Sequence, residues 1–192
     1  PLIDRIRAVL DPWLGSPRRK LGPSVATLLY RYEATRPAQL ARLKVEINTR
    51  EHFAVLGYRR QKLEVDNPWF NGSASLVTFK AEELLATKLR ALFQRRKGRD
   101  LFDLTAALER LELDEQRIVD CFLHYLDESG LTVSRAMFEE NLAAKMEAID
   151  FVDDVRPLLA PAVDYDPAAA ATLLRERLIV KIPGAPWKGA EE

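Results

Sequence analysis

The sequence contains little cysteine and no long apolar run, and each shortage excludes a class of protein. A single cysteine, Cys121, excludes an internal disulfide framework and a cysteine-rich zinc site. No apolar stretch approaches the ~20 residues that a helix needs to cross a membrane, and no signal peptide is recognisable. Glycine-rich phosphate loops, whether of the dinucleotide-binding or the P-loop type, are also missing. These shortages favour a cytoplasmic protein with no membrane partner.

Neither sign of charge is in excess. The chain has 29 Lys and Arg residues and 29 Asp and Glu residues, so its total charge gives no indication of nucleic-acid binding. At 192 residues, with 47% hydrophobic and 30% charged residues, it suits one large or two small globular domains. Pro1 is not an initiator methionine, and a helical pattern already begins at Leu2. We therefore expect the chain to be a fragment of a longer protein.

The order of the residue patterns predicts an α+β fold. Apolar residues at helical spacing predict a first helix over residues 2–14, which ends at Gly15. Strand-like patterns follow, with turns expected at Asn67-Pro68 and Asn71-Gly72-Ser73. The expected strands are residues 25–33, 43–48, 53–65 and 76–79. The expected later helices are residues 81–96, 100–111, 115–129, 135–148 and 168–180. Strands first and helices afterwards indicate a sheet domain at 1–79, a helical domain at 80–182 and an irregular tail at 183–192.

Lys88 is an unusual residue on the helix predicted for residues 81–96. It lies near the centre of the apolar stripe of that helix, whereas Glu83, Arg90 and Gln94 are expected to face solvent. A lysine on a packed face must extend to solvent, find an anion or lose its charge. It can therefore be a phosphate-binding residue or an ordinary lysine at the edge of the core. The leucines expected to be buried are Leu84, Leu85, Leu92, Leu104, Leu108 and Leu111.

The segment QRRKGRDLFDL, residues 94–104, has the highest density of charge. Its basic residues are Arg95, Arg96, Lys97 and Arg99. Gly98 separates two helices, and Asp100 and Asp103 lie three apart in the first turn of the second. Acids at this position have an ordinary role in capping a helix and balancing its dipole. Together with four basic residues they also suit a polyphosphate and metal site.

Glu46 is the candidate carboxylate on a strand. In residues 43–48 apolar and polar residues alternate, so Glu46 and Lys44 share the polar face of the predicted strand. A carboxylate fixed on a strand suits Mg²⁺, which takes hard oxygen ligands. The alternative is a solvent-facing glutamate on a half-exposed sheet. The remaining acids near the C-terminus read as solvated loop residues, and these are Asp153, Asp154, Asp164 and Asp166.

Four stretches together give the chain a family resemblance. They are KVEINTREHF at 44–53, VDNPWF at 65–70, FKAEELLATKLRALFQRRKGRDLFD at 79–103 and SRAMFEENLAAK at 134–145. With these stretches the chain resembles the AbiEii/AbiGii family of nucleotidyl transferase toxins. The resemblance implies a nucleotidyltransferase-type sheet followed by a helical domain. It also implies Mg²⁺-dependent transfer of nucleotides from an NTP to an acceptor, such as tRNA or another RNA, and a cognate antitoxin.

The same resemblance assigns roles to particular residues. It implies a catalytic set of Glu46, Lys88, Asp100 and Asp103 around one cleft, with at least one of the two aspartates acting in catalysis. Lys88 is expected at the nucleotide phosphates, with Arg95 and Arg99 as further nucleotide-binding residues. Glu46 is the expected metal ligand.

One family element has no counterpart in the sequence. The family begins with a Gly-Gly/Ser turn and a strand carrying an Asp-x-Asp metal pair, and no such segment is present. We therefore expect these 192 residues to be incomplete and inactive as a transferase. Two alternatives stay open: a truncated, catalytically inactive remnant that binds a nucleotide or an antitoxin, and a helical nucleic-acid binder that uses the segment 95–99. The upstream reading frame would distinguish the enzyme from the remnant.

Overall fold

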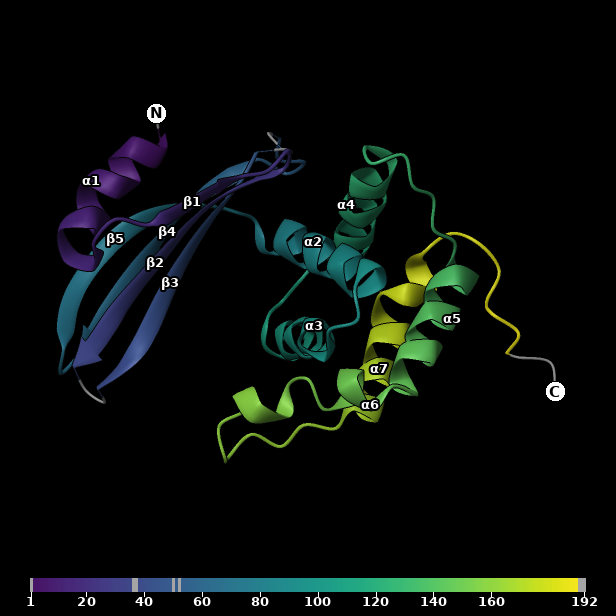
Figure 1. The fold of residues 1–192 in the computed structure, drawn as a ribbon. Coiled ribbons are helices and arrows are strands. Elements are labelled where there is room, and N and C mark those ends of the chain that lie inside the picture. The colour runs from purple at the N-terminus through teal and green to yellow at the C-terminus, as the bar shows by residue number, and fades with distance from the viewer. Residues whose placement is uncertain (1, 36–37, 50, 52, 190–192) are drawn as a thin grey trace. The chain divides into compact units, whose positions relative to one another are not determined.

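A computed structural model describes residues 2–35, 38–49, 51 and 53–189 of the chain. The fold is α+β, with small antiparallel sheets and a larger set of helices, as the residue patterns predict (Figure 1). The chain divides into two compact units, Pro1–Phe53 and Ala54–Glu192. The expected domain limits of 1–79, 80–182 and 183–192 stay predictions.

The first unit is a helix followed by a three-stranded antiparallel sheet. The helix α1, Leu2–Leu14, has the predicted bounds and ends at Gly15, whose φ of +73° favours glycine. The strands β1, Arg18–Leu21, β2, Val25–Thr35, and β3, Ala38–Asn48, lie in the order β1-β2-β3. β1 was not expected, because a short basic strand has no alternation of polar and apolar residues. A hydrogen bond of 2.8 Å from the Tyr30 hydroxyl to Asp11 joins β2 to α1.

The second unit begins with a hairpin. β4, Tyr58–Asn67, and β5, Phe70–Phe79, pair along their full lengths. The turn predicted at Asn67-Pro68 is confirmed, and the Asn67 side chain accepts hydrogen bonds of 2.9 Å from the backbone of Trp69 and of Phe70. The second predicted turn is wrong, because residues 71–73 lie inside β5, opposite residues 64–66. A tight turn at Pro68-Trp69 fixes the register and lets pairing run on through the polar residues.

Helices form the rest of this unit. They are α2, Ala81–Gln94; α3, Gly98–Arg110; α4, Glu115–Asp127; α5, Arg135–Met146; α6, Ile149–Val152; and α7, Pro167–Arg177. Two short 3-10 helices lie at Arg156–Leu158 and Ile179–Lys181. Asp114, Ser134 and Asp166 cap α4, α5 and α7 by accepting hydrogen bonds from backbone N–H groups of the first turn. The five predicted helices are confirmed within a few residues, whereas α6 is too short to give a periodic pattern.

The helices enclose one apolar core. Leu85, Leu92, Leu104 and Leu108 are buried, as expected. The prediction is wrong for Leu84, which is 44% exposed at the side of the apolar stripe of α2, and for Leu111, which is 50% exposed just beyond the end of α3. Cys121 is buried among these apolar residues, and burial raises the pKa of its thiol to about 11. Within the described part of the chain, no helix has the length and apolarity that a membrane span requires.

Glu83 corrects the sequence-based assignment of the faces of α2. Expected to face solvent, it is fully buried where α2 packs against α4. Its carboxylate accepts hydrogen bonds from the backbone of Val55 at 2.6 Å, from the backbone of Leu56 at 2.9 Å and from the Tyr125 hydroxyl at 2.7 Å. Three donors compensate the loss of hydration, which explains how a charged group can lie inside.

Candidate functional site

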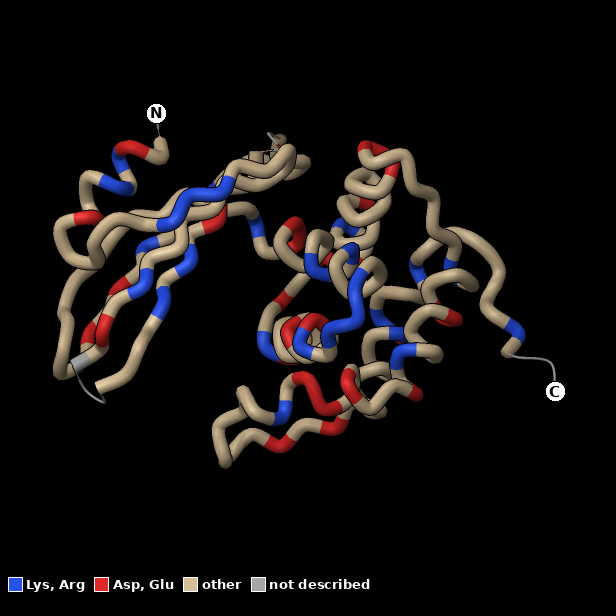
Figure 2. The backbone as a smooth tube through the Cα atoms, viewed as in Figure 1, with Lys and Arg blue, Asp and Glu red and all other residues tan. Residues whose placement is uncertain are grey.

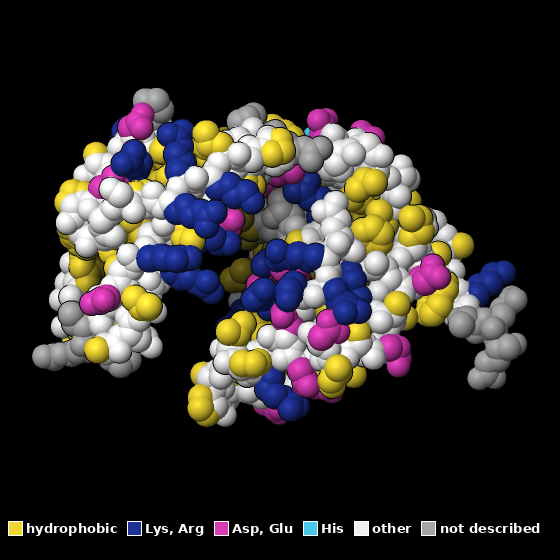
Figure 3. Space-filling view, viewed as in Figure 1, with side chains coloured by type: hydrophobic (Ala, Val, Ile, Leu, Met, Phe, Trp, Pro, Cys, Tyr) yellow, Lys and Arg dark blue, Asp and Glu magenta, His cyan; other side chains and the backbone are white. Residues whose placement is uncertain are grey.

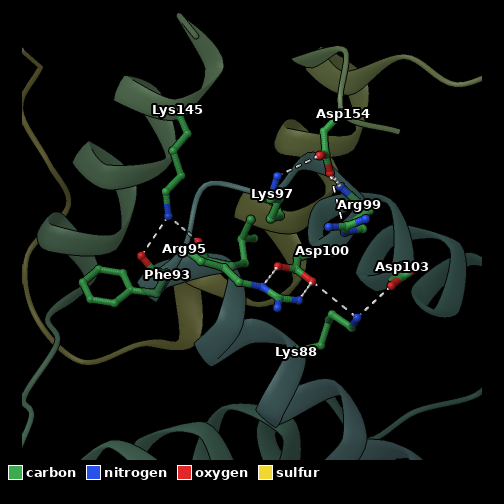
Figure 4. A network of polar contacts seen from close by, with 10 residues as sticks. Lys88, Phe93, Arg95, Lys97, Arg99, Asp100, Asp103, Lys145 and Asp154 are labelled. Atoms are coloured by element: carbon green, nitrogen blue, oxygen red, sulfur yellow. Dashed lines mark hydrogen bonds and ion pairs between the residues drawn. The ribbon is translucent and has the colours of Figure 1, made fainter. Parts of the chain in front are cut away.

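The residues expected at the nucleotide meet where α2 ends and α3 begins (Figure 4). Lys88 lies on α2, Arg95 caps the C-terminus of α2, and Asp100 and Asp103 lie on the first two turns of α3. We call these four residues the polar cluster. The short connection through residues 96–97 turns the chain so that side chains of the two helices face one another. The structure therefore brings together Lys88, Asp100 and Asp103, as expected from the sequence.

Asp100 is the buried centre of the polar cluster. Its side chain has no exposed surface, and its two oxygens accept hydrogen bonds of 2.7 Å from Nε and Nη2 of Arg95. Lys88 Nζ lies 3.3 Å from Oδ1 of the same carboxylate. The hydrogen bond to Asp100 raises the pKa of Arg95, against the opposing effect of desolvation. A buried carboxylate between two cations orients both of them and is itself electrostatically compensated.

Lys88 lies between two carboxylates. Besides its contact with Asp100, its Nζ lies 2.8 Å from Oδ2 of Asp103. The side chains of Lys88 and Asp103 are 31% and 47% exposed, so this half of the polar cluster opens to solvent. Of the three possibilities for a lysine on an apolar stripe, Lys88 has found anions.

A second acidic residue organises the basic segment. Asp154 accepts a hydrogen bond of 3.2 Å from the backbone N–H of Arg99, and Lys97 Nζ lies 3.4 Å from its carboxylate. The Asp154 side chain is only 12% exposed, so its assignment as a solvated loop acid is wrong. Burial alone would raise the pKa of Asp154, but the hydrogen bonds and charges of Arg99 and Lys97 lower it overall. Arg96 pairs with Asp150 at 2.7 Å, so each basic residue from 95 to 99 has a carboxylate partner.

Gly98 lets the start of α3 approach α6 closely. A Cβ at this position would collide with the carbonyl oxygen of Phe151 and lie 3.2 Å from the carbonyl carbon. The glycine therefore allows the close packing that brings Asp154 to Lys97 and Arg99.

Lys145 is a buried residue of the site that the sequence analysis missed. Its Nζ donates hydrogen bonds to the carbonyl oxygens of Leu92 and Phe93, the latter at 2.8 Å, at the C-terminal end of α2. Desolvation lowers the pKa of Lys145 to about 8, while the negative charge of Asp100 acts in the opposite direction. Its signal in the sequence is the one that marks Lys88, because Phe138, Leu142 and Lys145 recur at helical spacing on one face of α5.

Glu46 lies on β3 in the first unit. Its side chain is 51% exposed and forms an ion pair of 3.0 Å with Lys44. This is the local environment of a glutamate on a solvent-facing sheet, which was the alternative considered from the sequence. A single cleft that also includes Glu46, and a metal-binding role for this residue, stay predictions.

The described residues do not fit a Mg²⁺ site by themselves. Among them, no group of three or more His, Cys, Asp and Glu side chains could hold a metal ion. Asp100 contacts two cations, and Asp103 contacts Lys88. Mg²⁺ needs oxygen ligands in near-octahedral geometry, and these carboxylates are already paired with positive charges.

Comparisons with known proteins agree with this arrangement of residues. A search of curated proteins finds no match. Among solved structures, the chain is similar to the one titled "Crystal structure of JHP933 from Helicobacter pylori", with 22% sequence identity and a TM-score of 0.47. The match covers 83% of this chain and 62% of that one, so the chain spans less than two thirds of that protein's length. The family model described as nucleotidyl transferase AbiEii toxin, Type IV TA system, matches residues 1–175. The chain therefore belongs to the AbiEii family of nucleotidyl transferase toxins of type IV toxin–antitoxin systems.

Proposed function

We propose that the protein transfers nucleotides from an NTP to an RNA acceptor such as tRNA, and that the polar cluster binds the triphosphate. We also propose that it acts in the cytoplasm and that a cognate antitoxin controls it. Family membership supports the reaction class. The observation that carries the proposal for the site is the buried Asp100, which orients two partly exposed cations, Lys88 and Arg95.

The hydrogen-bonding capacity of these cations supports phosphate binding. The Arg95 guanidinium has five N–H donors, and its contact with Asp100 uses two of them. Its side chain is 53% exposed, so the remaining donors are accessible to a ligand. Since Asp100 already fixes the guanidinium, a phosphate gains these hydrogen bonds with little further loss of side-chain entropy.

Asp103 is the replaceable partner of Lys88. A phosphate oxygen that takes its place at the ammonium leaves the buried contact of Asp100 intact, because Asp103 is the exposed carboxylate of the pair. We propose that Asp100 is a positioning residue and that Asp103 is the aspartate that contacts substrate. Arg99, which is 45% exposed and pairs with Asp154, would supply a further cation for the triphosphate.

The chemistry of this site is charge neutralisation. In nucleotidyl transfer a hydroxyl of the acceptor attacks the α-phosphorus, a new P–O bond forms, and pyrophosphate leaves. Negative charge grows on the leaving phosphates, and preorganised cations stabilise it without reorganising during the reaction. Lys88 and Arg95 would serve this role. The Mg²⁺ expected from the resemblance remains part of the proposal, with ligands beyond those that the polar cluster offers.

Binding of NTPs to the 192-residue chain tests the role of the polar cluster. We expect each of the four ribonucleoside triphosphates to release measurable heat on titration, and Lys88→Ala to weaken the tightest of them at least about tenfold. Arg96→Ala is the matched control, since Arg96 is equally basic, 57% exposed and paired only with the exposed Asp150. It should change the Kd less than about twofold. Absence of binding, or equal effects of the two substitutions, would remove the polar cluster from nucleotide recognition.

The alternative function is a binding remnant without transferase activity. The shortage of grouped carboxylates among the described residues favours it for this chain. An assay with radiolabelled NTP, Mg²⁺ and total tRNA separates the two functions. Label transferred to RNA in a Lys88-dependent manner supports the enzyme. NTP binding that depends on Lys88 but gives no transfer supports the remnant.

A further inference from the structure

The sheet of the first unit has one strongly basic face. Residues that pair directly across antiparallel strands lie on the same side of a sheet, and alternate residues of a strand lie on opposite sides. Arg18 pairs with Leu29, which pairs with Lys44, and two residues further along Lys20, Thr27 and Glu46 form the next row. Arg31 and Arg42 pair with each other on the same side. We call the resulting set the basic face, and its members are Arg18, Lys20, Arg31, Arg42 and Lys44.

The basic face is the solvent side of the sheet. All five of its cations are exposed, whereas Ala26, Leu28 and Tyr30, which point to the other side, are buried. Figure 2 shows the Lys and Arg positions along β1, β2 and β3, and Figure 3 shows basic side chains gathered over these strands. Residues 1–53 contain ten Lys and Arg residues and five Asp and Glu residues, although the whole chain is balanced.

These cations are poorly neutralised by the protein itself. Glu33 and Glu46 lie on the same side of the sheet, and Glu46 pairs with Lys44 at 3.0 Å. In the part of the chain that the structure describes, no ion pair joins the other four cations to a carboxylate. Like charges directly opposite one another destabilise a sheet, and Arg31 and Arg42 are such a pair. A bound polyanion would offset this repulsion.

We propose that the basic face binds the phosphodiester backbone of a nucleic acid. The cations extend over three strands, about 4.8 Å apart, with steps of about 7 Å along each strand, so one small anion cannot contact them all. A chain of phosphates can. No aromatic residue lies on this face among the described residues, so the binding is to the backbone without stacking of bases. A membrane surface fits less well, because Leu40 is the only strongly exposed large apolar residue described on this face.

This inference goes beyond the proposed function, since it concerns a separate surface and needs no NTP. The test is fluorescence anisotropy of a labelled 20-base-pair RNA duplex with the 192-residue chain at increasing KCl concentration, without nucleotide. We expect log Kd to rise with log salt concentration with a slope of roughly 3 to 4, corresponding to four unneutralised cations. A DNA duplex of the same sequence shows whether the A-form helix is preferred.

Two matched pairs of variants make the test specific to the basic face. Arg31→Ala/Arg42→Ala should reduce the salt slope by about 2, whereas Arg117→Ala/Arg156→Ala removes the same charge from exposed helical positions and should leave the slope unchanged. Arg18→Ala should reduce the slope by about 1, whereas Arg19→Ala, on the opposite side of β1, should not.

Folding is controlled by the melting temperature. It should not fall in Arg31→Ala/Arg42→Ala, because this variant removes a repulsive pair. Equal losses of binding within either pair of variants, or binding to anionic vesicles without binding to either duplex, would overturn the proposal.

Discussion

Arg95 and Asp100 meet through two hydrogen bonds of 2.7 Å, with the carboxylate fully buried and the guanidinium half exposed. This asymmetry separates two roles within one ion pair. The buried acid fixes the geometry, and the exposed base remains accessible to a ligand. Lys88 repeats the relationship, because it contacts the same buried carboxylate and an exposed one on the next turn of α3.

Replacing Asp100 should destabilise the fold more than replacing Asp103. Asp100→Ala leaves two cations without their buried partner, and we expect a loss of about 2–3 kcal/mol in the free energy of unfolding. This is the low end for a broken buried pair, because Arg95 and Lys88 keep contact with solvent. Asp103→Ala removes an exposed partner and should cost less than about 1 kcal/mol. Urea denaturation followed by far-UV circular dichroism measures both, and equal losses would contradict the positioning role of Asp100.

Gly98→Ala should be among the most destabilising single substitutions in the helical part. The added Cβ meets the carbonyl oxygen of Phe151, which belongs to backbone and cannot rotate away, so we expect a loss of about 3 kcal/mol. Gly130→Ala is the control, since Gly130 has a φ of +71° and no neighbour within 4 Å of a new Cβ. Only backbone strain of about 1 kcal/mol applies there. Similar melting temperatures of the two variants would show that α3 and α6 can move apart.

Glu83→Gln should also destabilise the protein, by about 2 kcal/mol. The amide of glutamine has one acceptor oxygen, whereas the Glu83 carboxylate accepts hydrogen bonds from two backbone N–H groups and the Tyr125 hydroxyl. Glu82→Gln, at a partly exposed position on the same turn of α2, should change stability by less than about 0.5 kcal/mol. The comparison uses thermal unfolding at constant pH. A Glu83→Gln variant as stable as the Glu82→Gln variant would mean that these hydrogen bonds contribute little.

The sequence was sufficient for features that depend on local periodicity. The bounds of α1 and the order of strands and helices follow from local pattern. So does the meeting of Lys88 with Asp100 and Asp103, since a short connection between two helices leaves few ways for them to pack. Residues held by distant partners could not be predicted in this way. A helical wheel of α2 gives one apolar stripe, but α2 packs against α3, α4 and α5, and Glu83 is buried on a second side.

Lys145 and Asp154 show the same limit from the other direction. Each contacts a part of the polar segment more than fifty residues away along the chain, Lys145 at Leu92 and Asp154 at Arg99. Tertiary packing alone determines which loop acid becomes buried and which stays solvated. The basic face of the first unit depends likewise on strand register, which one expected strand and one missed strand could not supply.

Lys145 should make stability depend on pH in the alkaline range. Its pKa falls from 10.5 to about 8 on folding because the ammonium is desolvated, so below pH 8 the folded state carries the full cost of a buried charge. Between about pH 8 and 10.5 the folded protein has lost this proton while the unfolded chain still binds it, and stability therefore rises with pH. A shift of this size corresponds to roughly 3 kcal/mol. The neutral amine can still donate to the carbonyl oxygens of Leu92 and Phe93.

The measurement compares the free energy of unfolding of the natural chain with that of Lys145→Met at several pH values from 7 to 10.5. Subtraction removes the contributions of the other titrating groups, and the difference should shift by roughly 3 kcal/mol in favour of the natural chain as the pH rises. Lys181→Met is the control, because Lys181 is 32% exposed and pairs with Glu115. Its difference from the natural chain should not increase over the same range. A flat difference for Lys145→Met would mean that the ammonium of Lys145 keeps its proton in the fold, stabilised by the two carbonyl oxygens and by Asp100 more than burial disfavours it.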